Sequence, residues 1–352
     1  MSNLIKKSVQ AMHGYVPGEQ PSDPKVVKLN TNENPYLPSP GVQDVLSMVD
    51  VATLSRYPDP TASALREAIA ELHDCSPEQV FVGNGSDEVL ALCLRAFVER
   101  DGSVGWFDPS YSLYPTLTAI EELQAAPVAL DEDFGWNMPE NYQAALFFLT
   151  NPNAPTSLLF PKEKIANFAD SFKGVLVVDE AYADFAKASC LDLALSHKNV
   201  LVARTLSKSY SLAGIRLGYC VGDADLIAAM MKVKDSYNVD YLTQEIALAA
   251  IRDQDTMRAN VEAICETRKL VSDSLIEQGF DVLDSRTNFL WIKPPEGLSA
   301  HSLFEKLRSE NILVRYFAGS EKTRHHLRVT IGTAPEMFSF LDALKNILNK
   351  GK

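Results

Sequence analysis

The stretches Gly174-Val-Leu-Val-Val-Asp179 and Asn199-Val-Leu-Val-Ala-Arg204 decide the fold of this chain. Each is a short, continuous apolar run that ends in a charged residue. Such runs are typical of strands that are buried on both faces of a sheet. Further runs of this kind begin at Gln79, Ser103 and Ala145, and a helical pattern follows each of them. This alternation predicts an α/β fold with a mostly parallel central sheet.

The chain divides into three regions by pattern. Residues 1–45 are rich in Pro, Gly and Asn and predict an extended N-terminal arm that packs on the small domain or on a partner subunit. Residues 46–250 carry the strand and helix alternation and predict the large domain. A long amphipathic stretch from Thr256 to Gln278 predicts a helix that leads into a second domain. Residues 251–352 mix strand and helix patterns and predict a smaller α+β domain.

Composition excludes several classes of protein. A net charge of −13 over 352 residues, without a cluster of Lys and Arg, disfavours nucleic-acid binding. The five cysteines form no C-x-x-C pair and the six histidines show no ligand spacing, so we expect neither a metal site nor a disulfide framework. The N-terminus lacks a signal-peptide core, and the longest apolar runs are too short to span a bilayer. We expect a cytoplasmic protein without membrane contact.

Lys208 and Asp179 are the candidate catalytic pair. Asp179 ends one buried strand, and Lys208 follows the next strand after the turn Thr205-Leu-Ser207. Ligands of open α/β sheets bind at the carboxyl edge, where both residues are expected. An aldehyde cofactor with a pyridine ring needs an amine that forms a Schiff base and a carboxylate that keeps the ring nitrogen protonated. A solvated lysine and a helix-capping aspartate are the ordinary alternatives, but a partly desolvated Lys208 has the lowered pKa that an imine-forming amine requires.

A phosphate site is predicted beside this pair. The segment Gly83-Asn-Gly-Ser-Asp-Glu88 follows a strand and opens a helix, so backbone N–H groups and the positive end of the helix dipole meet there. Thr205, Ser207 and Arg216 add two hydroxyls and a guanidinium. The segment lacks the glycine fingerprint of dinucleotide sites and the lysine of ATP sites, which disfavours a hydride-transfer enzyme.

An ordinary strand-to-helix turn is the alternative interpretation of that segment. In such a turn, Ser86 or Asp87 is the N-cap of the helix. We expect the Asp87 side chain to cap the helix and only its backbone amide to face a phosphate, because the carboxylate would repel the anion.

Two tyrosines follow strand ends and are candidates for contacts with a flat ring. Tyr182 comes three residues after Asp179 and can donate to a phenolate oxygen on the cofactor. Tyr111 follows Asp108-Pro-Ser110 and can stack on the ring. Core packing is the commoner role for a tyrosine.

Together these motifs resemble the fold type I enzymes that use pyridoxal 5′-phosphate, and within them the histidinol-phosphate aminotransferase family. The resemblance covers essentially the whole chain. Its landmarks, in the order of the family, are Tyr15-Val-Pro-Gly18, Leu29-Asn-Thr-Asn-Glu-Asn-Pro35, Arg56-Tyr-Pro-Asp59, Gly83-Asn-Gly-Ser-Asp-Glu88, Asp179-Glu-Ala-Tyr182, Thr205-Leu-Ser-Lys208, Leu212-Ala-Gly-Ile-Arg216 and Leu327-Arg-Val-Thr-Ile-Gly332.

The resemblance implies a role for each cofactor-site residue. Lys208 forms the Schiff base and moves protons, Asp179 pairs with the pyridinium nitrogen, and Tyr182 binds the ring oxygen. Tyr111 stacks on the ring. The implied phosphate ligands are Gly85, Ser86, Asp87, Thr205, Ser207 and Arg216.

The resemblance also implies substrate contacts and a homodimer with shared active sites. Arg328 and Arg315 bind substrate anions, and Asn34 and Tyr15 lie on the substrate side. Tyr57 reaches the phosphate of the cofactor in the neighbouring subunit.

One loop departs from the family pattern. The family has Asn-Pro-Thr-Gly after its central strand, and this Asn binds the ring oxygen of the cofactor, whereas this chain reads Asn151-Pro-Asn-Ala-Pro-Thr-Ser157. Ala154 therefore occupies the position of that Asn. Either Asn153 replaces it through a shifted backbone, or Tyr182 holds the oxygen alone.

The implied activity is the transamination of L-histidinol phosphate with 2-oxoglutarate, which yields imidazole acetol phosphate and L-glutamate in histidine biosynthesis. An aromatic amino-acid aminotransferase and the threonine-phosphate decarboxylase of cobalamin synthesis share the cofactor and stay open as alternatives. A regulator with an aminotransferase-like domain is disfavoured, since it needs a DNA-binding domain that the arm of about 45 residues does not supply.

Overall fold

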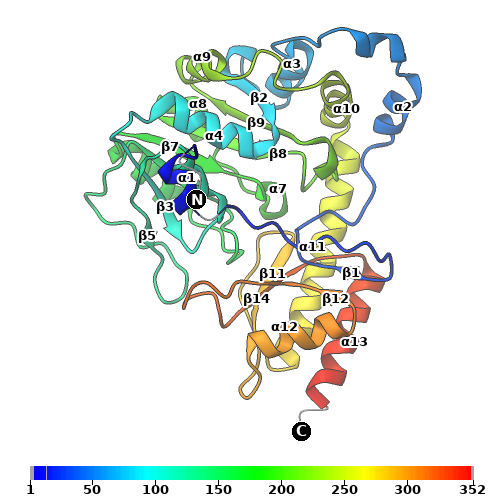
Figure 1. Ribbon diagram of the computed structural model, residues 1–352. Helices are drawn as coiled ribbons and strands as arrows, with labels where there is room; N and C mark the ends of the chain where they lie inside the picture. Colours follow the sequence, from blue (N-terminus) through cyan, green and yellow to red (C-terminus); the bar gives the residue numbers. More distant parts are fainter. Residues whose placement is uncertain (1–3, 13, 350–352) are drawn as a thin grey trace.

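The computed structural model describes residues 4–12 and 14–349 and has the predicted α/β fold (Figure 1). Its largest sheet has eight strands and confirms the prediction of a mostly parallel sheet. In spatial order these strands are β2 (Val80–Asn84), β9 (Leu217–Gly222), β8 (Val200–Thr205), β7 (Val175–Asp179), β6 (Leu146–Thr150), β3 (Ser103–Asp108) and β4 (Gln124–Ala125), while β5 (Val128–Ala129) pairs with the end of β3.

Strand direction brings the functional segments to one edge of this sheet. Strands β3, β6, β7 and β8 run parallel, and β9 is antiparallel to both β8 and β2. Asp179 lies in register with Thr150 on one side and with Ala203 on the other. The carboxyl ends of five strands, β2 included, therefore meet at the same edge.

The sheet is buried on both faces, as its continuous apolar strands predict. Alternate residues of β7 and β8 enter different cores, with Val177 and Leu201 in one and Val178 and Val202 in the other. The first core is completed by helices α4 (Gly85–Phe97), α5 (Leu113–Ile120) and α9 (Ala224–Val233). The second is completed by α6 (Lys162–Ser171) and α8 (Leu191–Ser196).

A smaller sheet forms the lower part of the molecule in Figure 1. Its strands, in spatial order, are β10 (Asp281–Val282), β11 (Phe289–Lys293), β14 (Leu327–Thr330) and β13 (Arg315–Tyr316), all antiparallel. The long helix α11 (Gln254–Glu277) runs from the upper part into this lower part, where α12 (Ala300–Ser309) and α13 (Ala334–Asn349) also lie. The boundaries near residues 45 and 250 stay predictions.

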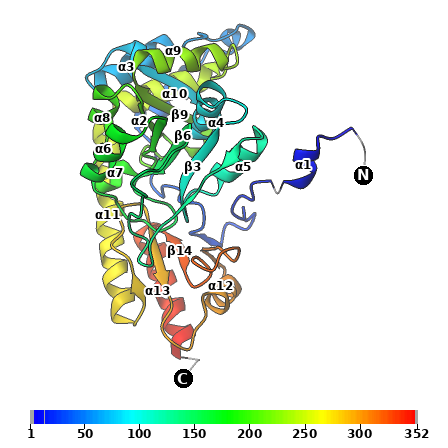
Figure 2. The same ribbon diagram turned by 90° about the vertical axis from the view of Figure 1, so that its left-hand side faces the viewer.

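The N-terminal segment is only partly extended, which corrects the prediction for residues 1–45. It contains the short helix α1 (Lys7–Ala11), which projects from the body in Figure 2, and strand β1 (Val27–Lys28), which pairs with β12 (Ile312–Leu313). Helix α2 (Pro40–Met48) begins inside the predicted arm, with Ser39 as its N-cap. The remaining helices are α3 (Ser63–Leu72), α7 (Ala183–Ala186) and α10 (Tyr241–Arg252), with 3-10 turns at Val51–Ser55, Pro77–Gln79 and Ala213–Ile215. Residues 1–3, His13 and residues 350–352 lie outside the described residues.

Candidate active site

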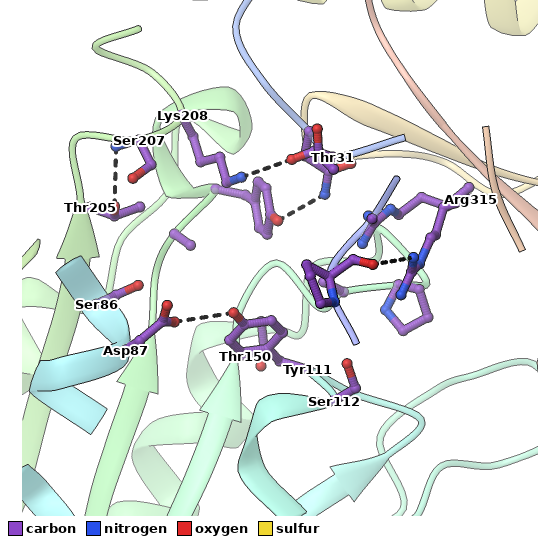
Figure 3. Close-up of a pocket in the computed structure, with 18 of the residues that line it drawn as sticks. Thr31, Ser86, Asp87, Tyr111, Ser112, Thr150, Thr205, Ser207, Lys208 and Arg315 are labelled. Carbon is purple, nitrogen blue, oxygen red and sulfur yellow. Dashed lines mark hydrogen bonds between the residues drawn. The ribbon is translucent and has the colours of Figure 1, made fainter. Parts of the chain in front are cut away.

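A cavity of about 250 Å³ opens where the strand ends, the N-terminal segment and the small sheet meet (Figure 3). Its lining includes twelve of the sequence-predicted site residues, namely Tyr15, Ser86, Asp87, Tyr111, Asp179, Tyr182, Thr205, Ser207, Lys208, Arg216, Arg315 and Arg328. Four predicted residues are not part of that lining: Asn34, Tyr57, Gly85 and Asn153. The structure thus gathers most of the predicted constellation, and the role of each residue stays a prediction.

Asp179 is a buried carboxylate at the end of β7, only 4% exposed. Burial raises its pKa to about 6, while hydrogen bonds from Tyr114 and from the backbone N–H of Ala181 lower it. The side chain is therefore mostly ionised at neutral pH, in a place where a cationic partner would be strongly favoured.

Tyr114 is a site residue that sequence reasoning missed. Its hydroxyl donates to Asp179 Oδ2 at 2.9 Å and lies 2.5 Å from Thr150 Oγ1. It sits in the first turn of α5 and is fully buried. A buried tyrosine hydroxyl needs a hydrogen-bond partner, and this requirement was the available signal.

Lys208 follows β8 and points its amine toward the N-terminal segment (Figure 3). Its Nζ donates to the Thr31 carbonyl at 3.2 Å and lies 6.0 Å from the centre of the Tyr182 ring. Desolvation lowers its pKa to about 8, and the positive charges of Arg328 and Arg216 act in the same direction. An amine with this pKa can take up and release a proton close to neutral pH.

The Asn30-Thr-Asn-Glu-Asn34 segment places different asparagines in different roles. Asn32 lines the cavity, and its Nδ2 donates to the Tyr182 hydroxyl at 2.9 Å. Asn34 instead donates to the carbonyls of Lys208 and Ser209 at 2.9 and 3.2 Å. Asn34 thus supports the backbone at Lys208 and Ser209, called the lysine loop below, from outside the cavity. This position corrects its assignment as a substrate contact. Asn32 is the cavity asparagine that the sequence did not reveal.

The predicted phosphate ligands Gly85, Ser86, Asp87, Thr205, Ser207 and Arg216 are called the phosphate cup below. This cup is built by close packing of β9 against the start of α4. A Cβ on Gly218 would lie 2.3 Å from the Ser86 backbone nitrogen, and one on Gly85 would lie 2.6 Å from Arg216 Nη2. Gly85 itself has a φ of +82°, which favours glycine. These glycines let the helix N-terminus, the Arg216 guanidinium and the Thr205 turn approach one another.

The capping prediction for this helix was wrong. The N-cap is Asn84, which makes no side-chain capping bond, so neither Ser86 nor Asp87 caps α4. The Asp87 carboxylate instead accepts from Arg216 Nη2 and from the Tyr111 hydroxyl, both at 3.1 Å. Arg216 Nη1 also donates to Ser207 Oγ at 3.3 Å. The Asp87 carboxylate therefore orients both Arg216, which belongs to the phosphate cup, and Tyr111, which lies beside it.

Arg328 and Arg315 form the cationic wall of the cavity. Arg328 Nη2 donates to the Asn30 carbonyl at 2.9 Å, whereas its buried Nε has no hydrogen-bond partner among the described residues. Its guanidinium lies 5.4 Å from the rings of both Phe289 and Phe317. Arg315 donates to the carbonyls of Val16 and Pro17 and so holds the segment that carries Tyr15. An unsatisfied Nε on a buried arginine is suited to bind an anionic ligand.

Asn153 lies behind the cavity wall, so the structure corrects its assignment as a ring-oxygen ligand. Its side chain is fully buried and donates to the Pro109 carbonyl and to Thr156 Oγ1, while its Oδ1 accepts from Ser110 Oγ. Ala154 and Pro155 line the cavity in its place. Within this site, Tyr182 is therefore the better placed of the two residues proposed for that oxygen.

Tyr57 lies outside the cavity and is 80% exposed. Its ring stacks on Tyr237, with ring centres 4.4 Å apart. A phosphate contact by this residue within one chain is therefore not seen.

Within residues 4–12 and 14–349, no group of three or more His, Cys, Asp and Glu side chains is arranged to hold a metal ion. No helix in the same ranges is both long and apolar enough to cross a membrane.

Comparison with known proteins identifies the family. The model of aminotransferase class I and II matches residues 24–344. A histidinol-phosphate aminotransferase of Geotalea uraniireducens is 44% identical over 345 residues, which is 97% of this chain and 99% of that protein. The chain belongs to the histidinol-phosphate aminotransferase family. The enzyme of the same name from Geobacter sulfurreducens is 43% identical over 348 residues, with 97% and 99% coverage.

Solved structures extend the comparison to the fold. The histidinol-phosphate aminotransferase of Sinorhizobium meliloti, solved in complex with pyridoxal 5′-phosphate, has a TM-score of 0.88 at 24% identity and 99% coverage of both chains. An L-threonine-O-3-phosphate decarboxylase of Porphyromonas gingivalis reaches a TM-score of 0.79 at 20% identity, covering 92% of this chain and 100% of that one. The fold is therefore shared between transamination and decarboxylation, and it does not separate family members by reaction.

Proposed function

We propose that this member of the histidinol-phosphate aminotransferase family transfers the amino group of L-histidinol phosphate to 2-oxoglutarate, with pyridoxal 5′-phosphate held at Lys208. The observation that carries the proposal is the pairing of the Lys208 amine with the buried Asp179 carboxylate in one cavity. Relatives that bear this enzyme name align over nearly the whole chain at 41–44% identity, which supports the choice of substrate.

The residues present fit this cofactor. Its phosphate has a place among the first turn of α4, the Ser86, Thr205 and Ser207 side chains, and the Arg216 guanidinium. Its ring nitrogen would lie against Asp179, which is otherwise a buried negative charge without a cationic partner among the described residues. When bound, pyridoxal 5′-phosphate supplies an electron sink for the bonds at the α-carbon of the substrate.

Each cavity residue then has a defined task. Asp179, held by Tyr114, keeps a negative charge beside the ring nitrogen and so favours its protonated form. Lys208, with a pKa of about 8, accepts the proton from the substrate α-carbon as a general base and returns it as an acid. Tyr182, fixed by Asn32, presents its hydroxyl to the phenolate oxygen of the cofactor.

Arg328 and Arg315 provide the substrate anion contacts in this proposal. An amino donor and an amino acceptor alternate in the site, and the acceptor brings a carboxylate where the donor brings a phosphate. A guanidinium fork can bind either group, and Arg328 still has its Nε available. The segment with Tyr15, which Arg315 holds, closes the same side of the cavity.

A homodimer is part of the proposal. Helix α2 and the turn after it expose several large apolar side chains, namely Leu46, Met48, Val51, Leu54 and Tyr57. Several exposed apolar side chains within a short segment favour association, and cyclic dimers are the commonest oligomers. Tyr57 would then contact the cofactor phosphate of the partner. A cytoplasmic location also belongs to the proposal, since all five cysteines are free thiols.

The test is a half-reaction assay with three amino donors. Bleaching of the visible cofactor band is measured with L-histidinol phosphate, L-phenylalanine and L-phosphothreonine in turn. We expect the highest ratio of rate to half-saturating concentration with histidinol phosphate. A higher ratio with phenylalanine would assign an aromatic aminotransferase, and release of CO₂ from phosphothreonine would assign a decarboxylase.

The cofactor assignment has its own test in the variant Lys208→Ala. Without this amine, borohydride should no longer fix pyridoxal 5′-phosphate covalently to the chain, as mass spectrometry can measure. Lys198 is an exposed residue that follows α8, and the variant Lys198→Ala is the control. This control should keep full trapping of the cofactor. Unchanged trapping in Lys208→Ala would contradict the assignment.

A further inference from the structure

A buried ion-pair network lies on the side of the strand ends that faces away from the phosphate cup. Arg204 is the last but one residue of β8, so its side chain leaves the sheet on the face opposite to that of Thr205. It donates from Nε and Nη2 to Glu180 Oε2 at 3.1 and 2.8 Å, and from Nη1 to Asp184 Oδ1 at 3.0 Å. The side chains of Arg204 and Glu180 are 12% and 1% exposed.

This network reaches the lysine loop through a single hydroxyl. Ser209, the residue after Lys208, donates from Oγ to Asp184 Oδ2 at 2.5 Å and is 2% exposed. Asp184 thus binds the arginine with one carboxylate oxygen and the lysine loop with the other. The network therefore joins the segment that carries Asp179 to the segment that carries Lys208. Glu180 follows Asp179 directly, and Ser209 follows Lys208 directly.

Resting on the proposed function, we propose that Ser209, Asp184 and Arg204 are positioning residues that fix the Lys208 amine relative to Asp179. None of the three is assigned to the chemistry above. The bond between Ser209 and Asp184 is charge-assisted and short, so it restrains the backbone on one side of Lys208 more tightly than a neutral hydrogen bond would. Arg204 binds the other carboxylate oxygen of Asp184 and so fixes the orientation in which this carboxylate accepts from Ser209.

The geometry explains why Lys208 needs such support. Among residues 4–12 and 14–349, its side chain makes one hydrogen bond, to the Thr31 carbonyl at 3.2 Å. A proton-transferring group must stay within a fraction of an ångström of its productive position, and small displacements cost large factors in rate. The restraint therefore acts through the backbone around Lys208, which Asn34 holds at the carbonyls of Lys208 and Ser209 and Asp184 holds through the Ser209 hydroxyl.

The first test compares Ser209→Ala with Ser189→Ala in the cofactor-loaded protein. Ser189 also belongs to the network, since its Oγ donates to Glu180 Oε2 at 2.8 Å, but it does not touch the lysine loop. Single-turnover bleaching of the cofactor band is followed over a range of histidinol phosphate concentrations. We expect Ser209→Ala to lower the limiting rate about tenfold, with a half-saturating concentration within about twofold of wild type.

The control variant separates positioning from general stability. Ser189→Ala should lower the melting temperature, because it removes a hydrogen bond from the same network, yet keep the limiting rate within about twofold of wild type. Ser209→Ala should fold, since Asp184 lines a second cavity of about 490 Å³ from which water can reach its freed oxygen. A limiting rate within twofold of wild type in Ser209→Ala, or an equal loss in Ser189→Ala, would overturn the proposal.

A second test uses the same cavity for chemical rescue. Arg204 also lines it, so Arg204→Ala leaves a gap that a guanidinium ion can enter. Added guanidinium at millimolar concentration should restore part of the limiting rate, whereas urea, which has a similar shape but no charge, should not. Equal effects of guanidinium and urea would count against the role of Arg204. If the wild-type protein itself shows no bleaching with histidinol phosphate, the proposed function fails instead, so the two failures are distinct.

Discussion

At the scale of single residues, the site depends on two groups whose pKa values are moved toward neutrality from opposite sides. Burial raises the pKa of Asp179 to about 6 and lowers that of Lys208 to about 8. Around pH 7 the carboxyl is mostly charged and the amine can exchange its proton. Both shifts have the same main cause, desolvation at the end of a buried sheet, and both come at a cost in stability.

The cost of Asp179 leads to a prediction for the protein without cofactor. Its pKa is higher in the folded state, at about 6, than the ordinary value of 3.8, so stability is lost as the pH rises through this range. We expect Asp179→Asn to be more stable than wild type, with an advantage that grows by about 1 to 2 kcal/mol between pH 5 and pH 8. Urea unfolding at the two pH values measures this difference.

The same variant should lose transamination, because a neutral amide no longer favours a protonated ring nitrogen. Asp101→Asn, at an exposed position, is the matched control and should show no such pH-dependent gain. A constant difference between Asp179→Asn and wild type at both pH values would show that the buried charge carries no stability cost.

Site residues could be predicted from the sequence where they follow the end of a buried strand. They could not be predicted where the local backbone conformation or a distant partner determines the direction of the side chain. Lys208 and Asp179 follow directly from strand ends, and the structure places both in the cavity. Asn32 and Asn34 occupy the same motif, yet Asn32 has a φ of +55° and turns its side chain toward Tyr182. Tyr114 was hidden in an apolar helix, because its partner Asp179 lies 65 residues away in the sequence.

At the scale of elements, the contact between β9 and the start of α4 shapes the phosphate cup. Gly218 lies opposite Gly83 in the pairing of β9 with β2, next to the turn into the helix. A side chain at this position would meet the backbone of Gly85 and Ser86. The backbone cannot yield as a flexible side chain does, so the position of the helix N-terminus depends on this glycine.

Gly218→Ala should therefore weaken cofactor binding and stability together. We expect the dissociation constant for pyridoxal 5′-phosphate to rise at least about tenfold and the free energy of unfolding to fall by about 1 to 3 kcal/mol. Gly214→Ala is the matched control, because a Cβ there meets nothing within 4 Å. Fluorescence titration of the apoprotein measures the affinity, and equal affinity in both variants would contradict this account of the cup.

The elements themselves were largely predictable. Strand β3 has the predicted bounds, and β7 and β8 differ by a residue at their ends, because buried strands carry a dense apolar signal. Helices α2 and α3 were not predicted. Both pack on α10, whose sequence lies about 200 residues further on, so tertiary contacts rather than local pattern specify them.

At the scale of the whole molecule, the proposed homodimer can be tested at Tyr57, which is exposed and lies outside the cavity of its own chain. Mixing Tyr57→Ala with Lys208→Ala under conditions that exchange subunits should create hybrids with one intact site, formed by Lys208 of one chain and Tyr57 of the other. Dimers of either variant alone contain no intact site. Equal mixing should restore about a quarter of wild-type activity, because half of the dimers are hybrids and half of their sites are intact.

Activity assays before and after subunit exchange measure this recovery, and light scattering checks that dimers are present. The control mixes Lys208→Ala with Asp179→Asn. Each of these changes damages the site of the chain that carries it, so the hybrids contain no intact site and should show no recovery. Absence of recovery with Tyr57→Ala in confirmed hybrids would place Tyr57 outside the partner's site.

The pairing of β1 with β12 has a consequence for biosynthesis. Val27 lies beside Ile312, so 285 residues separate two neighbours in this small parallel sheet. Ribosomes add roughly 5 to 20 residues per second, so the segment with Thr31 and Asn32 emerges about 15 to 60 s before its partner strand exists. The central sheet is complete once residue 222 has been added, so during roughly the last 5 to 18 s of this interval the nascent chain carries that sheet without β12. Thr31 and Asn32, which hold Lys208 and Tyr182, are then not yet fixed by the pairing of β1 with β12.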